Sequence, residues 1–166
     1  MRNKEVVNKI LYELGNFPPY FLEKVEKTES KRLVRKIQDL IDKFPIEKKW
    51  LLISGKTGIG KTHTVVYLAY QLVVRKLVSS VFFLPARKCR QLLDVALEKR
   101  LIILDDVDED SDGKVIKGLI CDCYDLNKIL YITTNLPFPT FTQQVGGDKV
   151  IRRIRERGVI LCLTSS

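Results

Sequence analysis

The chain has 166 residues, 45% of them hydrophobic, which suffices for one domain with a sizeable core and makes a second folded domain unexpected. No apolar run approaches the ~18 residues of a membrane span, the first five residues lack a signal-peptide core, and four cysteines do not form a disulfide framework, so we expect a cytoplasmic protein with reduced thiols. The net charge of +9 favours an anionic partner, with a solvated basic surface as the alternative.

The segment ahead of the first strand predicts two helices and a hook. Apolar residues at helical spacing predict a short helix within residues 6–14 and another within residues 33–44. The prolines within residues 17–21 exclude a helix interior there, so we interpret this stretch as a hook that packs over the next domain. We divide the chain into this N-terminal helix and hook, residues 1–28, and a main domain, residues 29–166.

Residues 55–62, GKTGIGKT, match the motif G-x-x-x-x-G-K-[ST], preceded by an apolar strand (50–53) and followed by a helix-spaced segment (64–77), as the motif requires. Glycines let backbone N–H groups surround phosphate oxygens, and the helix N-terminus adds its positive dipole end. We expect Lys61 to reach the β- and γ-phosphates and the Thr62 hydroxyl to ligate Mg²⁺. The residues expected to contact a nucleoside triphosphate are Gly55, Thr57, Gly58, Ile59, Gly60, Lys61, Thr62 and His63.

The lone histidine, His63, stands at the start of the helix after this loop, where we expect a structural residue of the helix face rather than a catalytic base. The chain then predicts a second buried strand, 81–84, and a short helix whose apolar stripe begins at Cys89. The entrance of that helix carries Arg87, Lys88 and Arg90, which could contact a nucleic-acid backbone.

A third apolar strand, 101–104, leads into two carboxylates, Asp105 and Asp106. We expect Asp105 to hold the Mg²⁺ shell and Asp106 to orient and activate an attacking water, which together with the phosphate loop makes a Walker B motif. The acidic run 108–112 imitates an EF-hand loop, but Leu119 stands where a bidentate Glu is required. It is therefore predicted to be a solvated turn ahead of the next helix.

The fourth predicted strand, 129–132, ends in Thr133, Thr134 and Asn135. Ligands of open parallel sheets collect at the carboxyl ends of the strands, so Asn135 could position the attacking water together with Asp106. The alternative is a turn-forming Asn ahead of Leu136-Pro137.

The last elements are a helix over residues 148–157, capped by Asp148, and a fifth strand, 159–163. The helix turns four arginines outward: Arg152, Arg153, Arg155 and Arg157. Such a row is either a nucleic-acid contact or a source of positive charge for a neighbouring subunit's phosphate, that is, an arginine finger.

Four motifs in this order, at residues 55–63, 101–106, 132–136 and 150–154, resemble the DnaC/DnaI-type AAA+ helicase loaders, and the related DnaA and IstB ATPases share much of the set. The resemblance covers about residues 16–163. It implies an α/β fold: a P-loop NTPase (AAA+) three-layer sandwich with a five-stranded parallel sheet. We expect no C-terminal lid domain and no separate N-terminal helicase-binding domain.

The resemblance also implies ATP and Mg²⁺ as ligands, hydrolysis as the reaction, and ATP-dependent, head-to-tail self-association. The roles it implies are phosphate binding by Lys61, Mg²⁺ ligation by Thr62 and Asp105, water activation by Asp106, a sensor role for Asn135, and an arginine finger at Arg153 with Arg152 as the alternative.

The function so implied is an ATP-hydrolysing replication factor, a helicase loader that acts with a replicative helicase and single-stranded DNA, without a membrane. Alternatives are an IstB-like transposition helper and an ATP-gated DNA-binding adaptor, for which the doublet Asp105-Asp106, lacking the more usual Glu, leaves room for slow turnover. A small P-loop kinase would need an acceptor pocket and a lid arginine set, and no segment offers room for them.

Overall fold

Five parallel strands form one sheet in the order β2-β3-β4-β1-β5. The structure is a computed structural model that describes residues 1–20, 39, 50–58 and 60–163. The strands are β1 (Trp50–Ser54), β2 (Val81–Pro85), β3 (Leu101–Val107), β4 (Ile129–Thr134) and β5 (Gly158–Cys162). The predicted five-stranded parallel sheet is confirmed.

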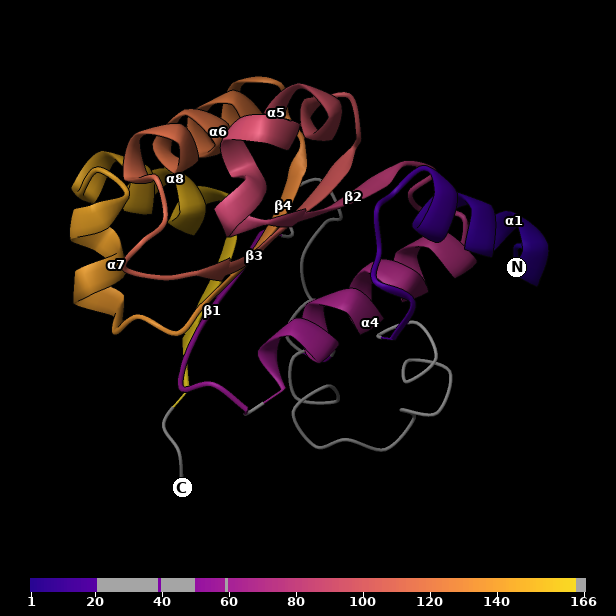
Figure 1. Ribbon diagram of the computed structural model, residues 1–166, viewed down its shortest axis with the longest axis horizontal. Helices are drawn as coiled ribbons and strands as arrows, with labels where there is room; N and C mark the ends of the chain where they lie inside the picture. Colours follow the sequence, from indigo (N-terminus) through magenta and orange to yellow (C-terminus); the bar gives the residue numbers. More distant parts are fainter. Residues whose placement is uncertain (21–38, 40–49, 59, 164–166) are drawn as a thin grey trace.

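Helices cover both faces of the sheet and make three layers (Figure 1). One face carries α1 (Lys4–Asn8), the π-helical η1 (Lys9–Glu13) and α4 (Lys61–Val74). The other carries the short η3 (Ala86–Lys88) with α5 (Cys89–Leu97), α6 (Gly113–Asp125), α7 (Phe138–Gln144) and α8 (Asp148–Arg157). This is the predicted α/β sandwich.

Alternate residues of each strand supply two separate cores. In β1, Leu51 and Ile53 pack in the cluster that contains α4, whereas Trp50 and Leu52 pack in the cluster on the opposite face. A strand covered on both faces needs apolar residues at every position, because successive side chains point to opposite sides. The continuous apolar runs of the sequence are therefore explained by the helices on both faces.

The N-terminal segment lies along the outer edge of β2. The Phe83 N–H donates to the Gly15 carbonyl (2.7 Å), and the Asn16 Nδ2 donates to the Phe83 carbonyl (2.9 Å). The Phe17 ring packs on the Phe83 ring with centroids 5.8 Å apart. A Cβ on Gly15 would come within 2.7 Å of the Ile10 carbonyl oxygen, so the close approach requires glycine. The hook thus covers a backbone edge that would otherwise be open to pairing.

The first predicted helix is present as α1 and η1, but its apolar residues do not all face inward. Val7 and Leu11 are buried, whereas Val6 is 46% and Leu14 51% exposed. The predicted helix over residues 33–44 and the boundary between residues 28 and 29 lie outside the described residues.

Three other expectations need correction. The helix after the loop begins at Lys61 rather than residue 64, and β3 continues past the two carboxylates to Val107. Asp148 is not the cap of α8: Gly147, with φ of 81°, holds that position and no side chain caps the helix. The helix α7 was not predicted at all.

All four cysteines are free thiols, as expected. Within the described ranges no helix is long and apolar enough to cross a membrane.

Candidate nucleotide-binding site

The turn between β1 and α4 forms one wall of a cavity of about 390 Å³ at the carboxyl ends of the strands. Gly58 and Gly60 have φ of 90° and 89°, and a Cβ added to either would meet no atom within 4 Å. Glycine is therefore needed here for the left-handed backbone and not for space. The cavity is lined by Tyr20, Thr57, Gly58, Gly60, Lys61, Thr62, His63, Asp105, Asp106 and Thr133.

Most predicted phosphate-binding residues meet in this cavity. Gly55 lies outside its lining; its N–H donates to the Thr134 carbonyl (3.1 Å), which anchors the loop to β4. Ile59 lies outside the described residues. His63 is buried on α4 at the cavity wall. The hook contributes Tyr20, which no sequence motif marks as a site residue.

The Lys61 ammonium is folded against the loop that carries it. Its Nζ donates to the carbonyl oxygens of Gly55 (2.6 Å) and Lys56 (2.8 Å), and the residue is only 8% exposed. Burial lowers the pKa of Lys61, and the negative charges of Asp106 and Asp105 oppose that shift. A cation held this close to glycine-rich backbone is placed to bind an anion in the cavity.

One carboxylate oxygen of Asp105 links α4 to β4 through hydrogen bonds. Its Oδ1 accepts hydrogen bonds from the Thr62 hydroxyl and from the Thr133 hydroxyl, each at 2.7 Å. Burial raises the pKa of Asp105, although both hydroxyl bonds stabilise the carboxylate and act in the opposite direction.

Mg²⁺ prefers oxygen ligands such as hydroxyls and carboxylates, so the side chains of Thr62 and Asp105 fit such an ion. Among the described residues no three His, Cys, Asp or Glu side chains lie so that together they could hold a metal ion. A Mg²⁺ ion here would therefore rely on phosphate oxygens and water for its remaining ligands, as Mg²⁺ bound with nucleotides does.

Asp106 lies in a bulge of β3. The register passes from Leu104 opposite Ile132 to Val107 opposite Thr134, so that Asp105 and Asp106 together face Thr133. Asp106 has φ of 64°, is exposed on the cavity side, and its N–H donates to the Thr133 hydroxyl (2.8 Å). Both predicted carboxylates line the cavity, and so does Thr133, which was not predicted as a site residue and whose only sequence signal is a polar side chain at the end of an apolar strand.

The remaining predicted residues do not line the cavity. Asn135 is exposed beyond the end of β4. On α8, Arg152 is exposed, whereas Arg153 is half-buried with its guanidinium carbon 5.5 Å from the centre of the Tyr124 ring. Arg153 also donates to the Lys149 carbonyl (3.2 Å). The structure thus gathers the loop residues and the two carboxylates at the cavity, but does not bring Asn135, Arg152 or Arg153 into its lining.

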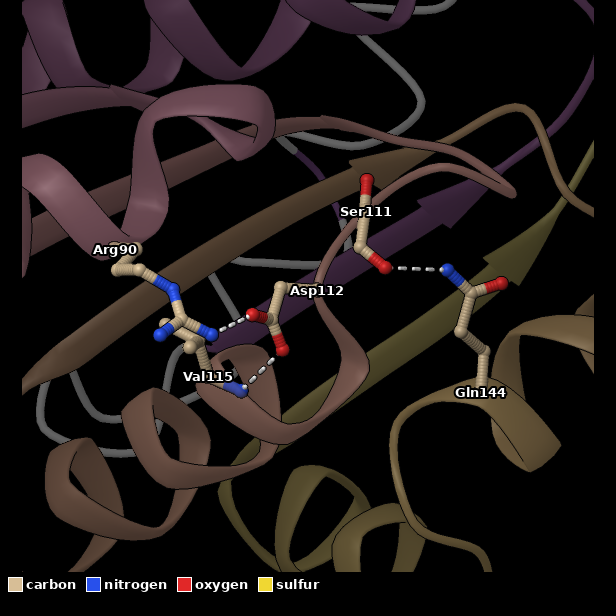
Figure 2. A network of polar contacts seen from close by, with 5 residues as sticks. All are labelled: Arg90, Ser111, Asp112, Val115 and Gln144. Atoms are coloured by element: carbon tan, nitrogen blue, oxygen red, sulfur yellow. Dashed lines mark hydrogen bonds and ion pairs between the residues drawn. The ribbon is translucent and has the colours of Figure 1, made fainter.

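The loop after β3 is fixed by side chains from two helices (Figure 2). Asp112 accepts from the Val115 N–H (3.2 Å) and so caps α6, and it forms an ion pair with Arg90 of α5, which lowers the pKa of Asp112. Gln144 of α7 donates to the carbonyls of Asp108 (2.6 Å) and Ser111 (3.0 Å). The loop that was expected to be a solvated turn is thus held in place by hydrogen bonds from α7.

No protein-family model and no curated sequence matches the chain. Solved structures do match. A crystal structure of the DnaC helicase loader has a TM-score of 0.69 at 20% identity, covering 88% of this chain and 99% of that one. DnaI has a TM-score of 0.61 at 17% identity, covering 98% and 94%.

The replication initiator DnaA bound to AMPPCP and single-stranded DNA has a TM-score of 0.59 at 18% identity, covering 86% of this chain and 50% of that one. The resemblance predicted from the motifs is confirmed for the fold: the chain has the AAA+ P-loop NTPase fold that the DnaC, DnaI and DnaA structures share.

Proposed function

We propose that this protein binds and hydrolyses ATP and that it loads a replicative helicase onto single-stranded DNA. The observation that carries the proposal is the hydrogen bond between Thr62 and Asp105, which joins the phosphate loop to the end of β3 inside one cavity. A phosphate loop, a carboxylate pair and a buried lysine at one point are the parts that ATP hydrolysis needs.

In this proposal the triphosphate lies against Gly58, Gly60 and Lys61, and Thr62 and Asp105 hold Mg²⁺. Mg²⁺ held by these two residues would neutralise negative charge of the bound phosphates. Lys61 exchanges its bonds to the Gly55 and Lys56 carbonyls for bonds to phosphate oxygens. The exchange replaces neutral acceptors with charged ones, and hydrogen bonds to charged acceptors are the stronger.

Asp106 is the proposed base. It orients a water whose oxygen attacks the γ-phosphorus while the bond from that phosphorus to the β–γ bridging oxygen breaks. The electron pair leaves with ADP and the water proton passes to the Asp106 carboxylate. The position of Asp106 on the cavity wall, next to Asp105 and Lys61, supports this assignment.

Self-association would complete the site. Asn135, Arg152 and Arg153 lie outside the cavity lining, so we propose that a neighbouring subunit, packed head to tail, supplies the arginine. Arg153 is packed on Tyr124 within its own chain, whereas Arg152 is exposed. The exposed Arg152 is therefore at least as suitable a finger as Arg153.

The proposed partners, single-stranded DNA and a replicative helicase, are supported by the net charge of the chain and by its structural neighbours. The net charge of +9 suits a nucleic-acid backbone, and Arg87 and Lys88 are exposed at η3, where they line a second cavity that also reaches Asp105. The matched DnaC structure is a helicase loader, and the matched DnaA structure holds single-stranded DNA. An IstB-like transposition helper would use the same site on a different partner.

The second candidate is an ATP-gated DNA-binding adaptor. One observation favours it. The second acidic residue of the Walker B motif is Asp106, whose side chain is one methylene shorter than that of the more usual Glu, and this difference suits slow ATP turnover. In that case nucleotide binding alone switches the protein, and hydrolysis is incidental.

A loading assay separates these candidates. The protein is mixed with a replicative helicase, a circular single-stranded DNA and ATP, and helicase bound to DNA is measured by gel filtration. If the protein is a loader, helicase is bound to DNA only in mixtures that contain both the protein and ATP. If Asp106→Asn loads as well as the unmodified protein, the adaptor is the better description. If no helicase is deposited, and a parallel mixture with a transposase in place of the helicase retains the transposase on DNA, the transposition helper is the better description.

A further inference from the structure

The Thr133 hydroxyl bridges the two Walker B residues. It donates to the Asp105 Oδ1 (2.7 Å) and accepts from the Asp106 N–H (2.8 Å). A hydroxyl carries a single proton, so acceptance from a backbone N–H leaves that proton for the carboxylate. Thr133 is 1% exposed, which keeps water from replacing either bond.

The backbone between these carboxylates needs such support. Asp106 has φ of 64°, in the left-handed region, where a residue with a Cβ is held only by its surroundings. The two carboxylates occupy a bulge, and a bulge leaves the extra residue without a regular partner across the ladder. The Thr133 side chain supplies that missing partner for the Asp106 N–H.

The far end of the bulge is closed by the next residue of β4. The Thr134 hydroxyl donates to the Val107 carbonyl (2.6 Å) and accepts from the Leu136 N–H (3.1 Å). Thr134 therefore fixes the strand beyond the bulge and does not touch either carboxylate. Of the polar residues that end β4, Thr133 alone lines the cavity in the described part of the chain.

We propose that Thr133 is a positioning residue for the proposed ATPase: its hydroxyl aims the Asp105 oxygen at Thr62 and holds Asp106 in the left-handed conformation that keeps its carboxylate at the cavity. This inference rests on the proposed function. Asp105 and Thr62 are the proposed Mg²⁺ ligands, and Asp106 is the proposed base, so one hydroxyl sets the geometry of both tasks.

The effect should resemble that of other groups that orient metal ligands. Loss of such a partner lowers metal affinity or activity by roughly 10–100-fold. Two separate changes are expected in Thr133→Val, a near-isosteric variant without the hydroxyl. The Mg²⁺ concentration that half-saturates the ATP complex rises, and at saturating Mg²⁺ kcat falls while KM for ATP stays the same.

The experiment compares four variants with the unmodified protein. Thr133→Val and Thr133→Ala remove the hydroxyl, Thr133→Ser keeps it, and Thr142→Val removes a hydroxyl that donates only to the Phe138 carbonyl within α7 (2.9 Å). A fluorescent ATP analogue is titrated first in EDTA and then at increasing Mg²⁺, and steady-state turnover follows.

The expected result has three parts. All variants bind the analogue in EDTA within about two-fold of the unmodified protein, because the phosphate loop is unchanged. Thr133→Val and Thr133→Ala need roughly 10–100-fold more Mg²⁺ and lose turnover by a similar factor, whereas Thr133→Ser and Thr142→Val stay within about three-fold.

Two results overturn the proposal. One is Mg²⁺ dependence and kcat in Thr133→Val and Thr133→Ala that equal those of Thr133→Ser. The other is loss of the folded state in both hydroxyl-free variants, measured by circular dichroism, because the hydroxyl would then serve the fold and not the site. Failure of the proposed function can be told apart from failure of this inference. In that case the unmodified protein itself would not bind the analogue, and both the proposed ATPase function and the role of Thr133 would be wrong.

Discussion

The hydroxyl of Thr62, in the first turn of α4, donates a hydrogen bond of 2.7 Å to the carboxylate of Asp105 in β3. These residues are 43 positions apart in the chain, so the contact exists only when the phosphate loop and the third strand have reached their places in the sheet. It joins the two motifs on which the proposed nucleotide chemistry depends.

Substitution of Thr62 tests this junction. Thr62→Val should leave nucleotide binding in EDTA unchanged but reduce the gain in ATP affinity that Mg²⁺ gives by roughly ten-fold, or about 1.4 kcal/mol. Thr62→Ser, which keeps the oxygen, should behave as the unmodified protein does. Isothermal titration calorimetry with and without Mg²⁺ measures both, and equal Mg²⁺ dependence in the Val and Ser variants would contradict the assignment.

Much of this site could be predicted from the sequence because its parts are local. The phosphate loop is one contiguous motif, and the strands that flank the site are apolar on both faces. Asp105 and Asp106 were found because they end an apolar run.

What could not be predicted depends on pairing between strands. The bulge at Asp105 and Asp106 decides that Thr133 faces both carboxylates. In a regular pairing of β3 with β4, Thr133 would lie opposite Asp105 alone. No local sequence pattern indicates the additional residue that the bulge places in β3. Asn135 was chosen instead because it follows the strand. No helix was predicted over residues 138–144, although proline is tolerated in the first turn of a helix, where its missing N–H is not needed, and Pro139 stands in that turn of α7.

Two glycines of α6 test the packing behind the Walker B loop. A Cβ on Gly113 would lie 2.1 Å from the Gln144 carbonyl oxygen, whereas one on Gly118 would meet nothing within 4 Å. Gly113→Ala should lower the free energy of unfolding by about 1–3 kcal/mol because α7 must shift. Gly118→Ala, in an exposed helix position, should raise it by about 0.5–1 kcal/mol. Urea denaturation measures both; a Gly113→Ala variant as stable as Gly118→Ala would contradict the close packing of α7.

The anchoring of the N-terminal hook is tested at Asn16. This residue has φ of 59° and donates its side-chain N–H to the Phe83 carbonyl. Asn16→Gly loses the bond but accepts the left-handed backbone, whereas Asn16→Ala loses the bond and is strained as well. Both should unfold at lower temperature, Ala below Gly, with a cost for Ala of about 1–3 kcal/mol. An Ala variant more stable than the Gly variant would show that the hook is not held in this conformation.

The cysteines should differ in their reactivity. Burial raises the pKa of Cys89 to about 11 and that of Cys123 to about 12, while Cys162 is exposed. At pH 8 both buried thiols therefore hold little thiolate, the reactive form. Iodoacetamide followed by mass spectrometry should find Cys162 modified first, with Cys89 and Cys123 protected until urea unfolds the chain. Early labelling of Cys123 in the folded protein would contradict its buried position in the α6 core.

The central claim is that the phosphate loop binds ATP for hydrolysis, and a pair of lysines from that loop tests it most directly. The Lys61 ammonium is buried in the loop, whereas Lys56 is exposed and offers the site only its backbone carbonyl, which an alanine retains. Release of phosphate from ATP is measured with Mg²⁺ and single-stranded DNA. We predict turnover by the unmodified protein and by Lys56→Ala, and a loss of roughly a hundred-fold or more in Lys61→Ala, since Lys61 is the cation placed to stabilise charge on the transferred phosphate. Equal turnover in the two variants would contradict the claim.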